Sequence, residues 1–142
     1  MPKPRVTVRQ RAAAIARACA CCEYRCAQEQ YAPDPFSVEH IVPSIKGGTN
    51  AMANLAYSCQ GCNGRKYISI EAIDLATGMI VSLYHPRQHR WNDHFAWNPD
   101  CSLIIALTPI GRATVEKLQL NRDGLVNLRR VLYRFDAHPP EC

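Results

Sequence analysis

The sequence predicts a small α+β protein that folds as a single domain. Its length of 142 residues is the commonest size for one domain. Segments with a helical pattern are interspersed with short segments in which apolar and polar residues alternate, as in strands. Hydrophobic residues make up 47% of the chain and charged residues 20%, which excludes a disordered protein.

In the N-terminal half, the pattern predicts two helices that flank a pair of strands. Residues 8–20 are rich in alanine and arginine, which favour a helix. Residues 36–42 alternate apolar and polar side chains, as a strand does. The predicted order is helix 8–20, loop 32–35, strand 36–42, polar loop 43–50, strand 52–57, turn 59–62 and helix 63–73.

The C-terminal half predicts a hairpin, a strand pair and two helices. Thr108 followed by Pro109 is a typical helix start, because threonine caps the first turn and proline fits its first position. Asn121 is the predicted cap of the last helix. The predicted order is hairpin 75–83, strand 91–97, turn 98–100, strand 103–107, a helix from Thr108 and a helix from Asn121 to about Tyr133.

The net charge of +5 lies entirely in the first half of the chain. Residues 1–35 carry an excess of three positive charges, residues 36–70 an excess of two, and residues 71–142 none. This distribution is a mild indication of a polyanionic partner. Apolar runs such as 19–22 and 103–107 are far shorter than the roughly 20 residues that span a bilayer. With no secretory signal visible, we expect no membrane partner and a cytoplasmic location.

Six of the eight cysteines fall in two clusters, at residues 19–26 and 59–62. Cysteines in a reducing compartment seldom form structural disulfides, so this layout predicts a structural zinc ion held by four thiolates. Buried cysteines without a metal are the alternative. The remaining two cysteines are expected to be a packing residue and a free thiol in the C-terminal tail; they are Cys101 and Cys142.

The second cluster defines one pair of zinc ligands, whereas the first leaves a choice. Cys59 and Cys62 form a CxxC knuckle, in which both sulfurs can converge on one ion. In the first cluster the predicted ligands are Cys22 and Cys26, and Cys19 or Cys21 can instead take one of these positions.

Three sequence stretches around these cysteines carry further recognisable motifs. The chain reads CEYRC, FSVEHIVPSIKGG, and then NLAYSCQGCNGRK. Over residues 22–66, nearly a third of the chain, it resembles the HNH endonuclease family, the ββα-metal or His-Me finger nucleases. The family's usual CEYC knuckle is why we place the first zinc pair at Cys22 and Cys26, although CEYRC is one residue longer.

The resemblance implies a division of the chain into a core and two flanking parts. An HNH ββα-metal core with zinc knuckles would occupy residues 22–73, preceded by a basic helix at 1–21. Residues 74–142 would add a hairpin and helices, which are similar to the C-terminal extension of stand-alone bacterial proteins of this type.

The resemblance also implies a Mg²⁺- or Mn²⁺-dependent hydrolase that cuts DNA and leaves 5′-phosphate and 3′-hydroxyl ends. His40 would be the general base, a role that suits an imidazole with a pKa near 6.5. Glu39 and Asn63 would offer oxygen ligands to the catalytic ion, because hard divalent cations prefer oxygen. Asn54 would brace the loop that carries His40. Asn63 stands where the family often has histidine, and Glu39 where it usually has aspartate.

Three basic residues are predicted to contact DNA phosphates, namely Lys46, Arg65 and Lys66. The predicted partner is double-stranded DNA, and no segment of the sequence indicates a dimer interface. An alternative function is a non-catalytic zinc-knuckle module that binds nucleic acid. A zinc scaffold for protein interactions is a third, and it predicts no DNA binding even at low salt.

Overall fold

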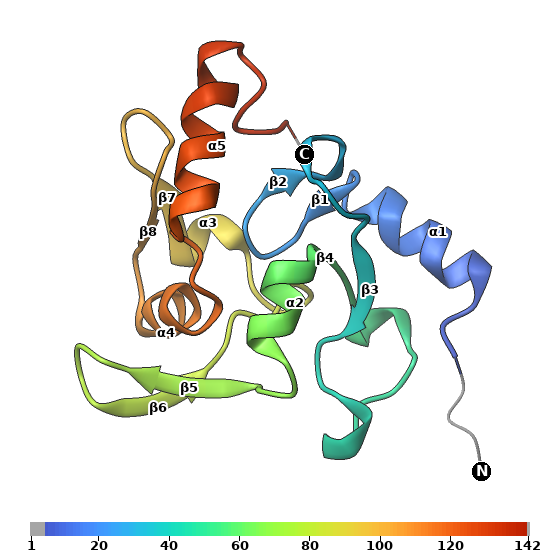
Figure 1. Cartoon of the computed structure of the whole chain (residues 1–142). Coiled ribbons are helices and arrows are strands. Elements are labelled where there is room, and N and C mark those ends of the chain that lie inside the picture. The colour runs from blue at the N-terminus through green and yellow to red at the C-terminus, as the bar shows by residue number, and fades with distance from the viewer. Residues whose placement is uncertain (1–4, 142) are drawn as a thin grey trace.

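The structure is a computed structural model that describes residues 5–141, and it mixes helices with short strands (Figure 1). The prediction of a mixed α and β protein is thereby confirmed. Predictions that fall on residues 1–4 and on Cys142 lie outside the described residues. None of the helices in the described part is long and apolar enough to cross a membrane.

The described residues form α-helices and two-stranded antiparallel sheets. The helices are α1 (Val8–Arg17), α2 (Gln60–Lys66), α3 (Trp91–His94), α4 (Pro109–Leu118) and α5 (Asp123–Arg134). The sheets are β1 (Cys21–Cys22) with β2 (Ala27–Gln28), β3 (Ser37–His40) with β4 (Leu55–Ser58), β5 (Glu71–Asp74) with β6 (Met79–Ser82), and β7 (Phe95–Trp97) with β8 (Ile104–Ala106).

Helix α1 begins with a capping box and is attached to the β3–β4 sheet. The Thr7 hydroxyl accepts the Gln10 backbone N–H at 3.0 Å, and the Gln10 side chain accepts the Thr7 N–H at 3.0 Å. The helix ends at Arg17, three residues earlier than predicted, because Cys19 and Ala20 have positive φ angles. Arg17 donates to the Leu55 carbonyl at 2.6 Å, which holds α1 against β4.

Strands β3 and β4 pair over four residues and lead directly into helix α2. The Cys59 sulfur caps α2 by accepting the Cys62 N–H at 3.4 Å, so the helix begins three residues before the predicted start. It ends at Lys66 and not at residue 73. The prediction of a longer helix is wrong because Tyr67 takes a positive φ and the isoleucine-rich segment after it enters β5.

In the C-terminal half the turn and second strand of the hairpin predicted over 75–83 are confirmed, whereas its first strand, β5, lies before residue 75. Thr108 caps α4 as predicted. The strand predicted over 91–97 forms only from Phe95, since residues 91–94 make the helical turn α3. Asn121 does not cap α5. Its side chain bonds both the N–H and the carbonyl of Ile104, so it ties α5 to β8.

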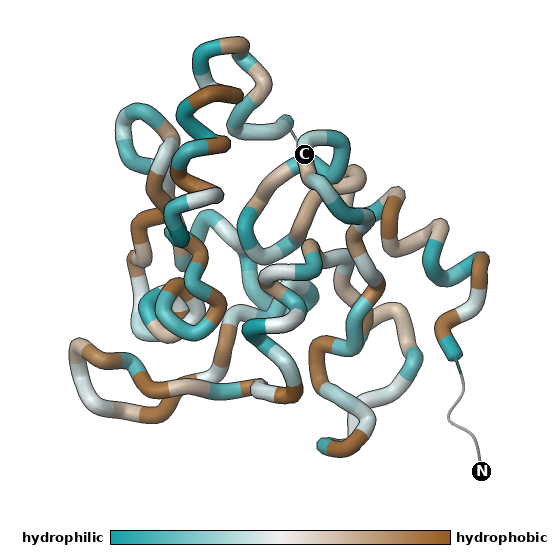
Figure 2. Tube along the Cα trace, viewed as in Figure 1, coloured by the Kyte–Doolittle hydropathy of each residue, from teal (hydrophilic) through white to brown (hydrophobic). Residues whose placement is uncertain are grey.

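One hydrophobic core joins elements from both halves of the chain and includes three of the clustered cysteines. Its largest fully buried side chains include Tyr24, Tyr57 and Phe95. Hydrophobic residues also run along the β5–β6 hairpin (Figure 2), where Ile73 and Ile80 pair with each other on the exposed face. The core lies beside β3, β4 and α2, and it supports the segment that carries the motif residues.

Candidate active site and cysteine cluster

Three of the predicted catalytic residues line one open cavity of about 290 Å³. Glu39 and His40 are the last two residues of β3, and Asn63 lies in α2. Only Cys59 separates β4 from α2, and β4 pairs with β3, so the helix packs beside β3. Tyr67 and Ser44 complete much of the rim. The structure therefore brings Glu39, His40 and Asn63 to the wall of one cavity.

The Glu39 carboxylate points inward from this cavity wall and is only 6% exposed. Its Oε1 accepts a hydrogen bond from the Tyr24 hydroxyl. Burial raises the pKa of Glu39 to about 7, although the charge of Lys66 and the Tyr24 bond lower it. Burial therefore favours the neutral form of this carboxyl group, and nearby positive charge such as that of Lys66 favours the ionised form.

The structure corrects the prediction that Lys66 contacts DNA phosphate. Lys66 is 1% exposed, and its ammonium donates to the Ile41 carbonyl at 2.8 Å inside the fold. Burial lowers the pKa of Lys66, and the negative charge of Glu39 opposes that shift. Lys66 is thus an internal countercharge for the Glu39 carboxylate. Lys46 and Arg65 are exposed on the surface.

The Asn54 side chain braces the loop that follows His40. Its Oδ1 accepts the Val42 N–H at 2.9 Å, and its Nδ2 donates to the carbonyls of Val42 at 2.9 Å and Thr49 at 2.8 Å. Strand β3 has ended at His40, so the amide takes the place of a backbone partner for Val42. In these contacts the Asn54 side chain binds the loop through backbone groups.

Glycine is needed at both positions after Lys46, for a different structural reason at each. Gly47 has a φ of +89°, a conformation that favours glycine, and it ends the 3₁₀ turn Ser44–Lys46. A Cβ on Gly48 would lie 1.6 Å from the Val42 carbonyl oxygen and 2.9 Å from the Asn54 amide nitrogen. Gly48 is therefore required for the close approach that lets Asn54 bind Val42.

Replacing Gly48 with alanine is expected to force the loop away from Val42 and to break the Asn54 brace. We expect a loss of at least about 2 kcal/mol in the free energy of unfolding, measured by denaturant titration. Gly64→Ala is the matched control, because nothing lies within 4 Å of its added methyl and alanine favours the α2 helix. If Gly48→Ala is as stable as Gly64→Ala, the loop does not depend on this contact.

One contact at the site was missed by the sequence analysis. The Nε2 of His40 lies 2.5 Å from the Oδ1 of Asn50, and both side chains are half-buried. Asn50 lies in the loop between β3 and β4, ten residues from His40. In the sequence, the position of Asn50 shortly after Lys-Gly-Gly was the one indication of a role, and it was too weak to predict a contact with His40.

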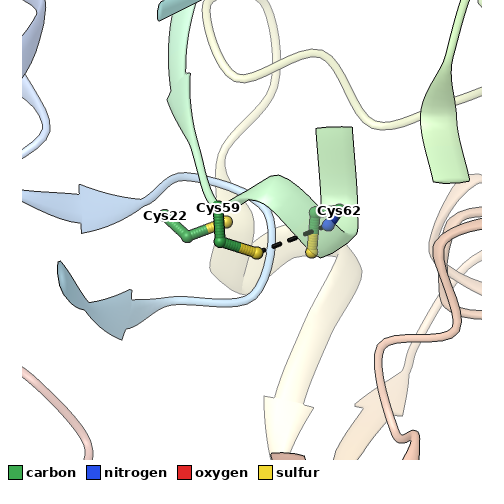
Figure 3. Close-up of side chains that lie close together, drawn as sticks. All are labelled: Cys22, Cys59 and Cys62. Atoms are coloured by element: carbon green, nitrogen blue, oxygen red, sulfur yellow. Dashed lines mark hydrogen bonds between the residues drawn. The ribbon is translucent and has the colours of Figure 1, made fainter. Parts of the chain in front are cut away.

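Three of the four predicted zinc ligands converge in the core (Figure 3). The sulfurs of Cys22, Cys59 and Cys62 lie within 4.8 Å of one another, and all three residues are buried. Cys22 ends β1, Cys59 follows β4, and Cys62 lies in the first turn of α2. Sulfurs bound to one zinc ion at about 2.3 Å would be about 3.8 Å apart, so the group fits a thiophilic metal.

The fourth predicted ligand, Cys26, is outside this group, as are Cys19 and Cys21. Cys26 is half-buried and closes the turn after Cys22, where its N–H donates to the Cys22 carbonyl at 2.9 Å. The Cys21 thiol donates to the Cys19 carbonyl at 3.4 Å. The first knuckle therefore contributes one sulfur to the cluster, from Cys22.

Arginine side chains surround the clustered sulfurs. The Nε of Arg25 donates to the Cys59 sulfur at 3.1 Å, and Arg122 approaches the sulfurs of Cys59 and Cys62 at 3.9 Å. Hydrogen bonds from the Cys22 and Cys62 thiols, assisted by Arg25, hold the pKa of Cys59 well below its usual range. Cys59 is thus favoured as a thiolate, the form that binds metal, whereas burial raises the pKa of Cys22, and hydrogen bonds to the other two sulfurs together with burial raise that of Cys62.

The paired β3–β4 unit, the following α2 helix and the buried cysteine cluster all lie within or at the ends of one segment of the chain, residues 19–67. Residues 19–67 match the model of the HNH endonuclease family, which confirms the predicted resemblance over this segment. No curated protein and no solved structure matches the chain. The HNH family consists of nucleases, and the match identifies nuclease-type activity in general terms.

Proposed function

We propose that this protein is a divalent-metal-dependent endonuclease that hydrolyses phosphodiester bonds in double-stranded DNA. The observation that carries the proposal is the convergence of Glu39, His40 and Asn63 on one open cavity within an HNH domain. The three side chains supply a base and two oxygen ligands, which are the groups that metal-assisted hydrolysis of a phosphodiester requires.

In the proposed reaction His40 takes a proton from the attacking water. The water oxygen then forms a bond to phosphorus while the bond from phosphorus to the 3′-oxygen breaks. The products are a 5′-phosphate and a 3′-hydroxyl, whose oxygen takes a proton from solvent. His40 suits this role because it ends a strand whose continuation is fixed by the Asn54 brace, so its backbone position is well defined.

Glu39 and Asn63 are the proposed holders of the catalytic ion, which we propose to be Mg²⁺ or Mn²⁺. The donor set at the cavity supports a hard cation, because it offers a carboxylate and an amide oxygen and no sulfur. When bound, such an ion relieves the negative charge that develops on the leaving oxygen. Tyr24 donates a hydrogen bond to Oε1 of Glu39 and would hold this carboxylate in place beside the ion.

A structural zinc ion is proposed at Cys22, Cys59 and Cys62, with Cys26 as the fourth ligand. The three converging sulfurs support it, and so does the position of Cys26 in the turn next to Cys22. Reduced thiols of this kind persist in a reducing compartment, and we propose a cytoplasmic location. The exposed side chains of Lys46 and Arg65 are the proposed phosphate contacts.

The test is a nicking assay on supercoiled plasmid DNA. We expect cleavage with Mg²⁺ or Mn²⁺, loss of cleavage after brief treatment with EDTA, and recovery on mixing with fresh Mg²⁺. The zinc content should remain at one ion per chain throughout, because a buried thiolate site exchanges slowly. DNA binding without cleavage under all metal conditions would indicate a non-catalytic binding module. Recovery with Zn²⁺ in preference to Mg²⁺ would contradict the proposed oxygen-ligand site.

A further inference from the structure

We propose that Asn50 is a positioning residue for His40, and that helix α1 holds Asn50 in place through Gln10. This inference rests on the proposed nuclease function, since it concerns the orientation of the general base. It brings into the active site a helix that lies outside the segment 19–67 that matches the HNH family.

The contact between Asn50 and His40 assigns the two ring nitrogens of the imidazole. The Oδ1 of Asn50 is an acceptor only, so the 2.5 Å contact places a proton on Nε2 of His40. A neutral imidazole with its proton on Nε2 keeps a lone pair on Nδ1. Nδ1 is therefore the nitrogen that accepts the proton of the attacking water, and Asn50 selects this tautomer.

Asn50 is itself held from outside its loop. The side-chain Nε2 of Gln10 donates to the Asn50 carbonyl at 2.8 Å, although the two residues are 40 positions apart. The same Gln10 side chain uses its Oε1 to accept the Thr7 N–H in the capping box of α1. Arg17 fixes the other end of α1 to β4. The chain of contacts thus runs from a rigid helix through Gln10 and Asn50 to the imidazole.

The loop has a separate brace, which makes the role of Asn50 distinguishable from a structural one. Asn54 fixes the loop through Val42 and the Thr49 carbonyl, and none of those contacts involves Asn50. Loss of the Asn50 amide therefore leaves the Asn54 brace intact while the imidazole loses its partner. The expected consequence is a slower chemical step with unchanged substrate binding.

The first test compares variants at Asn50 by steady-state cleavage of a defined DNA duplex with Mg²⁺. We expect Asn50→Ala to lower kcat by about 10- to 100-fold, the scale of a misplaced catalytic group, with KM and the Mg²⁺ requirement unchanged. Asn50→Asp retains an acceptor oxygen and should recover most of the kcat. Thr49→Ala is the matched control, because it removes a neighbouring polar group of the same loop whose hydroxyl accepts the Ala51 N–H at 3.2 Å.

The second test separates the capping role of Gln10 from its contact with Asn50. Gln10→Glu keeps the oxygen that accepts the Thr7 N–H, since glutamate serves equally well in a capping box. It removes the N–H that binds the Asn50 carbonyl and places an oxygen there instead. We expect about a 10-fold lower kcat with little change in melting temperature. A parent-like kcat in both Asn50→Ala and Gln10→Glu would overturn the proposal, as would a loss confined to KM.

The tautomer of His40 can be measured without any cleavage, so the positioning role of Asn50 can be tested separately from the proposed nuclease function. Imidazole ¹H–¹⁵N correlation spectra at mildly alkaline pH should show His40 with its proton on Nε2 in the parent and a mixture of tautomers in Asn50→Ala. A parent protein with this tautomer but no cleavage would refute the function and leave the contact standing. A His40 that carries its proton on Nδ1, or an unchanged spectrum in Asn50→Ala, would refute the positioning role.

Discussion

Replacement of His40 by alanine is expected to reduce DNA cleavage by about 10²-fold or more, the usual scale for a positioned general base. The side chain lines the open cavity and is half-buried, so its removal should leave the hydrophobic core intact. The variant should therefore fold, keep its metal at the cysteine cluster and bind DNA as the parent does. Nicking rate, zinc content and a binding titration on the same preparation measure the three properties.

A comparison with Asn63→Ala distinguishes the loss of the general base from the loss of a metal ligand. Asn63 is a proposed ligand of the catalytic ion, so its loss should raise the Mg²⁺ concentration needed for cleavage. His40→Ala should lower the rate at every Mg²⁺ concentration. If His40→Ala cleaves at the parent rate while Asn63→Ala does not, another residue removes the proton from water.

The largest expected effect on folding is that of Cys59→Ser. Four thiolates on a structural zinc ion stabilise a small domain by an amount on the order of 10 kcal/mol, and one lost ligand removes most of it. Cys59 also caps helix α2 and accepts a hydrogen bond from Arg25, so several contacts fail together. We expect a largely insoluble or unfolded chain without bound zinc, measured by elemental analysis and circular dichroism.

Two further cysteine variants complete this experiment. Cys19→Ala is the matched control, because Cys19 is exposed and lies outside the sulfur cluster, and it should fold with one zinc ion per chain. Cys26→Ser should reduce zinc retention if Cys26 is the fourth ligand. A Cys59→Ser protein that retains one zinc ion and melts as the parent does would show that the metal binds elsewhere.

The cysteine cluster and the cavity share structural elements, so damage to one should reach the other. Asn63 follows Cys62 directly in α2, and Tyr24 lies two residues after Cys22 and binds the Glu39 carboxylate. Each knuckle thus places one residue in contact with the proposed catalytic site. Loss of the cysteine cluster is therefore expected to disturb the proposed catalytic residues as well.

Several backbone elements were predictable because their causes lie within a few residues. The alternation in residues 36–42 predicted β3, and Thr108 with Pro109 predicted the start of α4. The prediction was wrong where the sequence pattern fitted both a helix and a strand. The helix predicted over 63–73 stops at Lys66, since the isoleucines beyond it complete a hairpin with β6.

By itself, the sequence determined the order of the HNH motif, the β3–β4 pair with its following helix, and the second cysteine knuckle. Only the tertiary structure decided which side chains meet. It buried Lys66 beside Glu39 and joined Gln10 to Asn50 across 40 positions. The physical reason is that strand and helix patterns depend on neighbouring residues, whereas the partner of a buried charge or amide depends on elements that packing brings together from distant parts of the chain.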